Sequence, residues 1–296
     1  MIIGARGVMI KQKQTIAILL VLCTAALFGV NGIPINEKNS PSGNLTSYQS
    51  VQAAQSTSAV KTSVIISGTG GTVTNNYCIK KNIPKSQFTN QIVALSKKGT
   101  PLIRIGNGKG PKVMIVAGVH GNELPSQIAA LKLANYLKSR SINGTVYIVP
   151  FVVPSNTAKD IRYWKGKNLN RITTTAGTPT NKILNLAKQL KVNVLGDFHS
   201  TKPGGDPGKM VVFSSKHPTY KSYIIAKYIS KKTGSATLTY NLSGVEYCGA
   251  LEDTTNLAGI PAVTCEVVSP HGTVKSGSVT KSYNQMIALL KYKKII

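Results

Sequence analysis

The sequence predicts an α/β protein with a mixed, largely parallel sheet that is covered by helices on both faces. Two observations lead to this prediction. Short apolar segments alternate along the chain with longer segments whose apolar residues recur every three or four positions, and this alternation of strands and helices is typical of a mostly parallel sheet. In addition, hydrophobic residues make up 42% of the 296 residues, which is enough for the core of a globular domain.

The expected elements begin with a strand-like pattern at Ser63, in SVIISG. Further strands are predicted over residues 113–117, 145–153, 192–196, 210–213 and 262–267. Helical patterns lie between them, over residues 126–138, 182–190 and 220–231, and a last helix is predicted over residues 279–292. The first of these helices has an apolar stripe that would pack on the sheet, formed by Ile128, Leu131, Ala134 and Leu137. We therefore expect one domain over residues 63–296.

The first 33 residues differ from this pattern. Arg6, Lys11 and Lys13 precede the uncharged run TIAILLVLCTAALFGV, which is the order of regions in a secretory signal. The run is shorter than the roughly 20 residues that span a bilayer comfortably, so we expect a signal peptide over residues 1–33, with a retained membrane anchor as the alternative. The protein is thus expected to be exported and to be extracellular or associated with the cell surface.

Residues 34–62 are rich in Ser, Thr, Gln and Asn and contain almost no large apolar side chain. A segment of this composition buries too little apolar surface to order itself. We expect a low-complexity tether between the signal segment and the domain.

The charge of the chain is strongly positive, with 36 Lys and Arg against nine Asp and Glu and a formal net charge of +27. Such a surface attracts polyanions. Most of the basic residues are lysines and the aromatic residues do not alternate with basic runs, which disfavours nucleic acid as a partner. An acidic cell wall or membrane surface is the expected partner, and a lysine-rich surface without a partner is the alternative.

Three potential metal ligands follow two of the predicted strands. His120 and Glu123 stand in GVHGNE, directly after strand 113–117, and His199 stands in VLGDFHS. A catalytic zinc ion takes three protein ligands and keeps an open position for water, and two histidines with one glutamate are a common set. Because the carboxyl ends of parallel strands meet at one edge of a sheet, these residues are expected to bind zinc together. The alternative is a loop hydrogen bond between His120 and Glu123 and an unrelated core histidine.

Glu266 lies in the otherwise apolar strand 262–267, where an unpaired carboxylate is costly to bury. A water in the open position of a zinc site would be a suitable partner, because Glu266 could take its proton and deliver it to the leaving amine. The alternative is a buried ion pair with a lysine. Asp197 precedes His199 by two residues, on the same face of a strand, and is expected either to orient that histidine or to end the strand in a turn.

Arginine is rare in this lysine-rich chain, yet the segment 156–173, NTAKDIRYWKGKNLNRIT, contains Arg162 and Arg171, with Asn170 beside the latter. An arginine near a metal can stabilise an oxyanion, and a second can hold a substrate carboxylate through two parallel hydrogen bonds. The choice of arginine favours such geometry over a merely solvated loop.

The motifs GVHGNE, VPSN…IR…NLNR, DFHS and GIPAVTCE occur in an order that resembles the zinc carboxypeptidase superfamily, most closely its succinylglutamate desuccinylase/aspartoacylase branch. The resemblance covers residues 100–270. It implies an α/β sandwich around a mixed, largely parallel sheet, and one zinc ion per chain held by His120, Glu123 and His199. It also implies roles for four further residues: Glu266 as general base and acid, Arg162 polarising the scissile carbonyl, and Asn170 with Arg171 holding a substrate carboxylate.

The chain departs from the family at Asn168, where an aspartate usually supports a zinc-binding histidine, so a neutral amide would make that histidine less basic. The tyrosine that closes over substrate in carboxypeptidases is either Tyr240 or Tyr247. His217 and His271 match no position of the family and are expected to be surface or turn residues.

We therefore expect a secreted, zinc-dependent amidohydrolase or carboxypeptidase that cleaves an amide or peptide bond next to a free carboxylate. Cell-wall peptides are the candidate substrates, because export and the basic surface both place the protein against an acidic wall. One alternative is a small-molecule N-acyl amino acid deacylase of the succinylglutamate desuccinylase/aspartoacylase type. Another is a wall-binding protein without turnover, which Asn168 favours and the intact set of His120, Glu123, His199 and Glu266 opposes.

Overall fold

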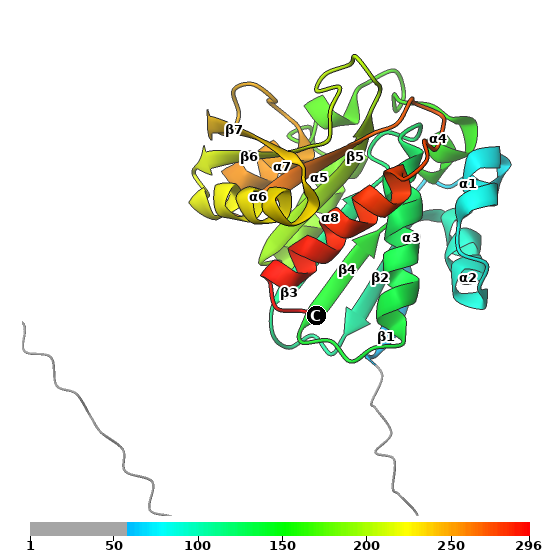
Figure 1. The fold of residues 1–296 in the computed structure, drawn as a ribbon. Helices are drawn as coiled ribbons and strands as arrows, with labels where there is room; N and C mark the ends of the chain where they lie inside the picture. The colour runs from blue at the N-terminus through cyan, green and yellow to red at the C-terminus, as the bar shows by residue number, and fades with distance from the viewer. Residues whose placement is uncertain (1–57) are drawn as a thin grey trace, which may run out of the picture. The chain divides into compact units, whose positions relative to one another are not determined.

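The computed structural model describes residues 58–296 (Figure 1). One eight-stranded sheet runs through this part of the chain, with the strand order β1-β2-β4-β3-β5-β8-β6-β7. The strands are β1 (Val60–Ser67), β2 (Gly99–Gly106), β3 (Lys112–Ala117), β4 (Thr145–Val149), β5 (Val194–Thr201), β6 (Val211–His217), β7 (Ala236–Leu242) and β8 (Ala262–Val268). The helices are α1 (Tyr77–Asn82), α2 (Gln87–Ser96), α3 (Leu124–Lys138), α4 (Pro154–Lys159), α5 (Pro179–Gln189), α6 (Tyr220–Thr233), α7 (Leu251–Leu257) and α8 (Ser278–Tyr292), with short 3-10 turns at Val73–Asn75 and Leu169–Arg171.

The centre of the sheet is parallel and its margins are mixed. Strands β4, β3, β5 and β8 are parallel neighbours. At one margin β2 pairs antiparallel with β4 and with β1, and at the other β6 pairs antiparallel with β8 and parallel with β7. The predicted fold class, a mixed and largely parallel sheet, is confirmed.

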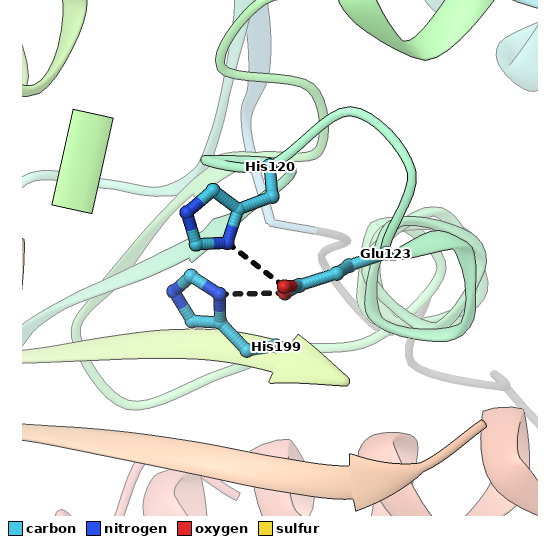
Figure 2. A group of neighbouring side chains, drawn as sticks. All are labelled: His120, Glu123 and His199. Atoms are coloured by element: carbon cyan, nitrogen blue, oxygen red, sulfur yellow. Dashed lines mark hydrogen bonds and ion pairs between the residues drawn. The ribbon is translucent and has the colours of Figure 1, made fainter. Parts of the chain in front are cut away.

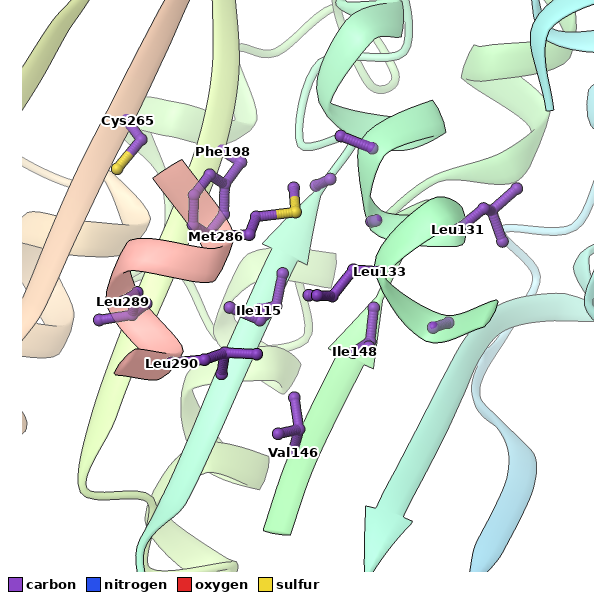
Figure 3. Close-up of a cluster of buried hydrophobic side chains, with 14 of the residues drawn as sticks. Ile115, Leu131, Leu133, Val146, Ile148, Phe198, Cys265, Met286, Leu289 and Leu290 are labelled. Atoms are coloured by element: carbon purple, nitrogen blue, oxygen red, sulfur yellow. The ribbon is translucent and has the colours of Figure 1, made fainter. Parts of the chain in front are cut away.

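Helices cover both faces of the sheet. On one face Ile115 and Phe198 pack with Leu133 of α3 and with Met286 and Leu289 of α8 (Figure 3), and α6 lies on the same side.

On the opposite face Met114 and Leu195 pack with Ile183 of α5 and Leu251 of α7. Because the central strands are buried on both faces, they read as continuous apolar runs such as KVMIVA rather than as alternating patterns. The face that carries α5 and α7 also carries the polar residues described below.

Several boundaries differ from those expected from the sequence. Strand β1 begins at Val60, three residues before the predicted start and inside the segment assigned to the tether. Strand β5 is shifted toward the C-terminus and ends at Thr201, so His199 lies within the strand and not beyond it.

Three of the elements that were not predicted have physical explanations. Strand β2 starts with Gly-Thr-Pro, a sequence typical of a turn. Strand β7 is an edge strand with few buried residues, and α7 is a short, polar helix without an apolar stripe. Local patterns do not distinguish such elements from loops.

The predicted signal or anchor segment, residues 1–33, and residues 34–57 of the predicted tether lie outside the described residues. Between residues 58 and 296, no helix is both long enough and apolar enough to cross a membrane. Cys78, Cys248 and Cys265 are free thiols.

Candidate metal centre and active site

The strand register places the candidate residues at one edge of the sheet. His199 on β5 and Glu266 on β8 are direct neighbours in the parallel pairing of these strands. His120 and Glu123 lie in the loop that joins β3 to α3, and β3 is the other neighbour of β5. The residues that the sequence predicted as ligands and as catalytic base therefore meet, as expected for polar groups near the carboxyl ends of parallel strands.

His120, Glu123 and His199 form a buried cluster in which one potential ligand atom from each residue lies within 4.8 Å of the others. Figure 2 shows both imidazole rings directed at the carboxylate of Glu123. The Nδ1 atom of His120 lies 2.8 Å from Glu123 Oε1, and the Nδ1 atom of His199 lies 2.7 Å from Glu123 Oε2. Burial alone would raise the pKa of Glu123, but the two histidines outweigh burial and lower this pKa well below its ordinary value.

The surroundings of the two imidazole rings fit a metal ion. The Nε2 atom of His120 lies 2.8 Å from Asn168 Oδ1, and that of His199 lies 2.9 Å from Asp197 Oδ2. Oxygens of this kind accept protons, so they favour the tautomer with the proton on Nε2. Each Nδ1 lone pair then faces an oxygen of Glu123, and such pairs of acceptors repel each other unless a proton or a metal cation lies between them. Two imidazole nitrogens and one carboxylate are a ligand set that suits zinc.

Asp197 contacts His199 on the side away from Glu123, on the same face of β5. It is fully buried, and its contact with His199 Nε2 is close but too poorly aligned to count as a hydrogen bond. Burial disfavours the charged imidazole, but Asp197 and Glu123 together outweigh burial and raise the pKa of His199. Of its two expected roles, the structure thus places Asp197 beside the histidine and not in a turn.

Close packing shapes the loop that carries His120. Gly118 has a φ of 77°, a conformation that favours glycine. Gly121 does not have a positive φ, but a Cβ atom at this position would lie 2.4 Å from the backbone of Asn156. Glycine is therefore required at position 121 because no side chain fits there. The side chain of Gln127 donates to the carbonyl oxygens of Gly121 and Glu123, at 3.1 and 3.0 Å. Gln127 was not singled out from the sequence, because a buried glutamine in a helix has no local signature.

Glu266 lies beside the cluster at the floor of a pocket, partly reachable by solvent through that pocket. Its Oε2 atom has no hydrogen-bond partner among the described residues, and no lysine of residues 58–296 forms an ion pair with it. Burial and the negative charge of Glu123 raise the pKa of Glu266 well above its ordinary value. The alternative of a buried ion pair with a lysine is therefore wrong.

The arginine segment faces the same pocket. Arg162 Nη1 donates to Glu123 Oε1 at 2.5 Å, next to the metal cluster. Asn170 Oδ1 accepts a hydrogen bond from the backbone of Leu251 at 3.1 Å. Arg171 is exposed and lies over the ring of Tyr247, 5.1 Å from its centroid. Its guanidinium is thus at the mouth of the pocket and is not buried.

This pocket has a volume of about 220 Å³. It is lined by His120, Arg162, Asn168, Asn170, Arg171, Asp206, Pro207, Phe213, Tyr247, Ala250, Glu252, Thr264 and Glu266. Of the two tyrosines left open by the sequence, only Tyr247 is part of the lining, and its hydroxyl donates to Asp206 Oδ2 at 3.2 Å. Tyr240 instead stacks on Phe213.

His271 lies in a turn and is partly exposed, as expected, but it is also close to the metal cluster, which was not expected. Its Nε2 atom lies 3.8 Å from Glu123 Oε1, and it lines a second pocket together with Glu123, Arg162 and Glu266. The signal that pointed to it was its position just after β8, five residues beyond Glu266. His217, by contrast, is exposed on β6, as expected.

Replacing Asn168 with aspartate should strengthen zinc binding about 10-fold or more without loss of activity. Asn168 Oδ1 lies 2.8 Å from His120 Nε2 and also accepts from the backbone of Asn170 at 3.0 Å, and an aspartate oxygen can make both contacts. The added charge makes the histidine a stronger ligand, and supporting residues of this kind change metal affinity by about 10- to 100-fold. Competition with a chelator of known affinity measures the change, and weaker binding would refute the proposed support of His120 by residue 168.

Comparisons with known proteins identify the family of the chain. Residues 109–292 match the family model of the succinylglutamate desuccinylase/aspartoacylase catalytic domain. A curated relative, the N-alpha-acetyl-L-2,4-diaminobutyric acid deacetylase of Halomonas elongata, is 31% identical over 124 residues, which are 40% of this chain and 35% of the relative. The match therefore spans only about a third of the relative's length.

Two solved structures share the fold. A succinylglutamate desuccinylase from a Silicibacter species superposes with a TM-score of 0.54 at 19% identity, over 68% of this chain and 63% of that one. A metallo-carboxypeptidase from Burkholderia cenocepacia superposes with a TM-score of 0.53 at 13% identity, over 81% of this chain and 65% of that one. Because the family model matches more than half of the chain and the fold agrees, the chain belongs to the succinylglutamate desuccinylase/aspartoacylase family.

Proposed function

We propose that this protein is a zinc-dependent amidohydrolase that removes an acyl group from the nitrogen of an amino acid with a free carboxylate. The observation that carries this proposal is the position of Glu266 beside the buried His-Glu-His donor set: Glu266 lines one pocket with His120 of that set, and its Oε2 atom has no hydrogen-bond partner among the described residues. Family membership and the curated relative, which is named for the deacetylation of an N-acetylated diamino acid, support the same reaction class.

His120, Glu123 and His199 would hold the metal, and a bound zinc ion supplies a Lewis acid that polarises the scissile carbonyl and acidifies the attacking water. Glu266 accepts the proton of that water at its free Oε2 atom and passes it to the leaving nitrogen. Arg162 lies next to Glu123 and lines the pocket, where its charge stabilises the oxyanion of the transition state.

The carboxylate of the substrate is assigned to Asn170 and Arg171 at the mouth of the pocket. Tyr247 packs against Arg171 and lines the same wall. Because the Arg171 guanidinium is exposed, solvent screens its contact with an anion, and its contribution is smaller than that of a buried ion pair.

A second candidate is the same cleavage in a cell-wall peptide by an exported enzyme. The signal-like pattern of residues 1–33 and the net charge of +27 support it. The pocket is open at Arg171, so a longer substrate could extend out of it. A wall-binding protein without turnover is the third possibility, and hydrolysis by the purified protein would exclude it.

Replacing Arg171 with methionine should reduce the preference for a free acid over its amide about fivefold. Exposed ion pairs contribute up to about 1 kcal/mol, which corresponds to a factor of about five. The measurement is kcat/KM for an N-acetyl amino acid and for the same compound with its carboxylate blocked as an amide. Arg140→Met is the matched control, because Arg140 is an exposed arginine outside this pocket. An acid-to-amide ratio that is equal in the wild type and Arg171→Met would contradict the assignment.

A further inference from the structure

We propose that Glu252 binds an ammonium group of the substrate, so that the preferred substrates are N-acyl amino acids or peptides whose reacting residue has an amine in its side chain. This inference rests on the proposed function, since it assigns the substrate class of the same pocket. It starts from a carboxylate that the proposed reaction does not use. Glu252 lies on α7, lines the pocket and is only 6% exposed.

The carboxylate of Glu252 has a free side. Asn256 Nδ2 donates to its Oε1 atom at 2.5 Å, and among residues 58–296 this is the one hydrogen-bond donor to the group. A buried carboxylate usually has several donors or a cation as partners, because burying a charge without them is costly. One oxygen of Glu252 is thus available to a group that enters the pocket.

The lack of a basic partner is notable in this chain. It contains 36 Lys and Arg residues and only nine Asp and Glu, yet no lysine or arginine of residues 58–296 forms an ion pair with Glu252. The neighbouring charges are negative: after burial, Asp253 and Asp197 are the main causes that raise the pKa of Glu252. Inside a strongly basic protein, this part of the pocket is therefore acidic, and a cation from outside would relieve the repulsion.

The position of Glu252 suits a substrate side chain. Thr264 lines the pocket with Glu252 and lies on β8 two residues before Glu266, in register with Asp197 on β5 and Phe213 on β6. Two residues along a strand correspond to about 6.6 Å. Thr264 and its two paired neighbours thus lie farther from the carboxyl end of β8 than Glu266 does. A short alkyl chain spans this distance.

The carboxylate and the ammonium are recognised by opposite charges in different parts of one pocket. Arg171 lies exposed at the mouth, whereas Glu252 is buried in the wall. A substrate with an N-acyl group, a carboxylate and a side-chain amine can place each of the three against a matching group.

A purely structural role for Glu252 makes a different prediction. Asn256 also donates to the carbonyl oxygen of Ala262 and accepts from its backbone nitrogen, and so joins α7 to β8. Glu252 could serve only to orient Asn256. Glutamine at position 252 keeps an oxygen that accepts from Asn256, so a structural role predicts equal effects of Glu252→Gln on charged and uncharged substrates.

The test compares Nα-acetyl-L-lysine with Nα-acetyl-L-norleucine, which has the same side chain without the amine. We expect the zinc-loaded wild type to prefer the lysine compound at least about 30-fold in kcat/KM, as for a buried charge pair. In Glu252→Gln this preference should fall to near one, through loss of activity on the lysine compound alone. Nα-acetyl derivatives of ornithine and 2,4-diaminobutyrate then determine the preferred chain length.

Glu246→Gln is the control, because Glu246 is an exposed glutamate outside the pocket. This variant should retain the preference for the lysine compound.

Calorimetric binding of L-lysine and L-norleucine provides a measurement that does not require turnover. Selective binding of lysine that is lost in Glu252→Gln would support the inference even if no compound were hydrolysed, in which case the proposed function would be wrong. Equal hydrolysis of both compounds by the wild type would overturn the inference and leave the proposed function intact. A preference that Glu252→Gln leaves unchanged, or no preference in either measurement, would also overturn it.

Discussion

Replacing Glu266 with glutamine should lower kcat by about 10²- to 10⁴-fold while the protein still binds one zinc ion per chain. The amide is nearly isosteric with the carboxyl group but cannot accept a proton from the attacking water, and general acid–base catalysis contributes a rate factor of this size. Glu266 is not one of the three clustered ligands, and its Oε2 atom has no partner among the described residues. The variant therefore keeps all three metal ligands and loses no hydrogen bond of Oε2.

Elemental analysis of the purified variant measures its zinc content, and initial rates at saturating substrate measure kcat. The control is again Glu246→Gln, which should retain full activity. Substantial turnover by Glu266→Gln would assign the base to another group. His271 would then be the first candidate, because it lies 3.8 Å from Glu123 and lines the adjoining pocket with Glu266.

Replacing His199 with alanine should remove nearly all bound zinc and nearly all activity while the fold remains intact. The variant loses one of three ligands from a buried cluster. The two apolar cores on the faces of the sheet do not depend on this side chain, so the domain should fold without the metal. With zinc present, the variant should melt at a lower temperature than the wild type. Zinc binds the native wild-type protein and stabilises it, and the variant lacks this stabilisation.

The measurements are zinc per chain after purification without added metal, the circular dichroism spectrum and the melting temperature. His217→Ala is the matched control, since His217 is an exposed histidine on β6 and lines neither pocket. If His199→Ala bound as much zinc as His217→Ala, the ligand assignment would be wrong. An unfolded variant would instead show that the metal cluster is needed for folding.

The fold class was predictable because it depends on local patterns. The runs KVMIVA and AVTCEVV are apolar because central parallel strands are buried on both faces. The edge strand β7 and the polar helix α7 were not predicted, because β7 is largely exposed and the buried residues of α7 are mostly polar, so neither has a periodic apolar stripe. Glu252 lies on α7. Because the polar composition of this helix prevented its prediction, the role of Glu252 was not predicted either.

The sequence by itself determined the set of potential metal ligands and the candidate base. His120 and Glu123 are three residues apart in one loop, and His199 and Glu266 are chemically unusual in apolar strands. A polar group in such a run requires a partner, and this requirement can be recognised without coordinates.

Only the tertiary structure decided which other residues join the pocket. It selected Tyr247 over Tyr240, brought His271 to within 3.8 Å of Glu123, left Arg171 exposed and buried Glu252 without a cationic partner from residues 58–296. Each of these outcomes depends on how loops and α7 pack across β5, β8 and β6. That packing depends on strand register and on contacts between residues far apart in the sequence, and no local pattern of residues encodes it.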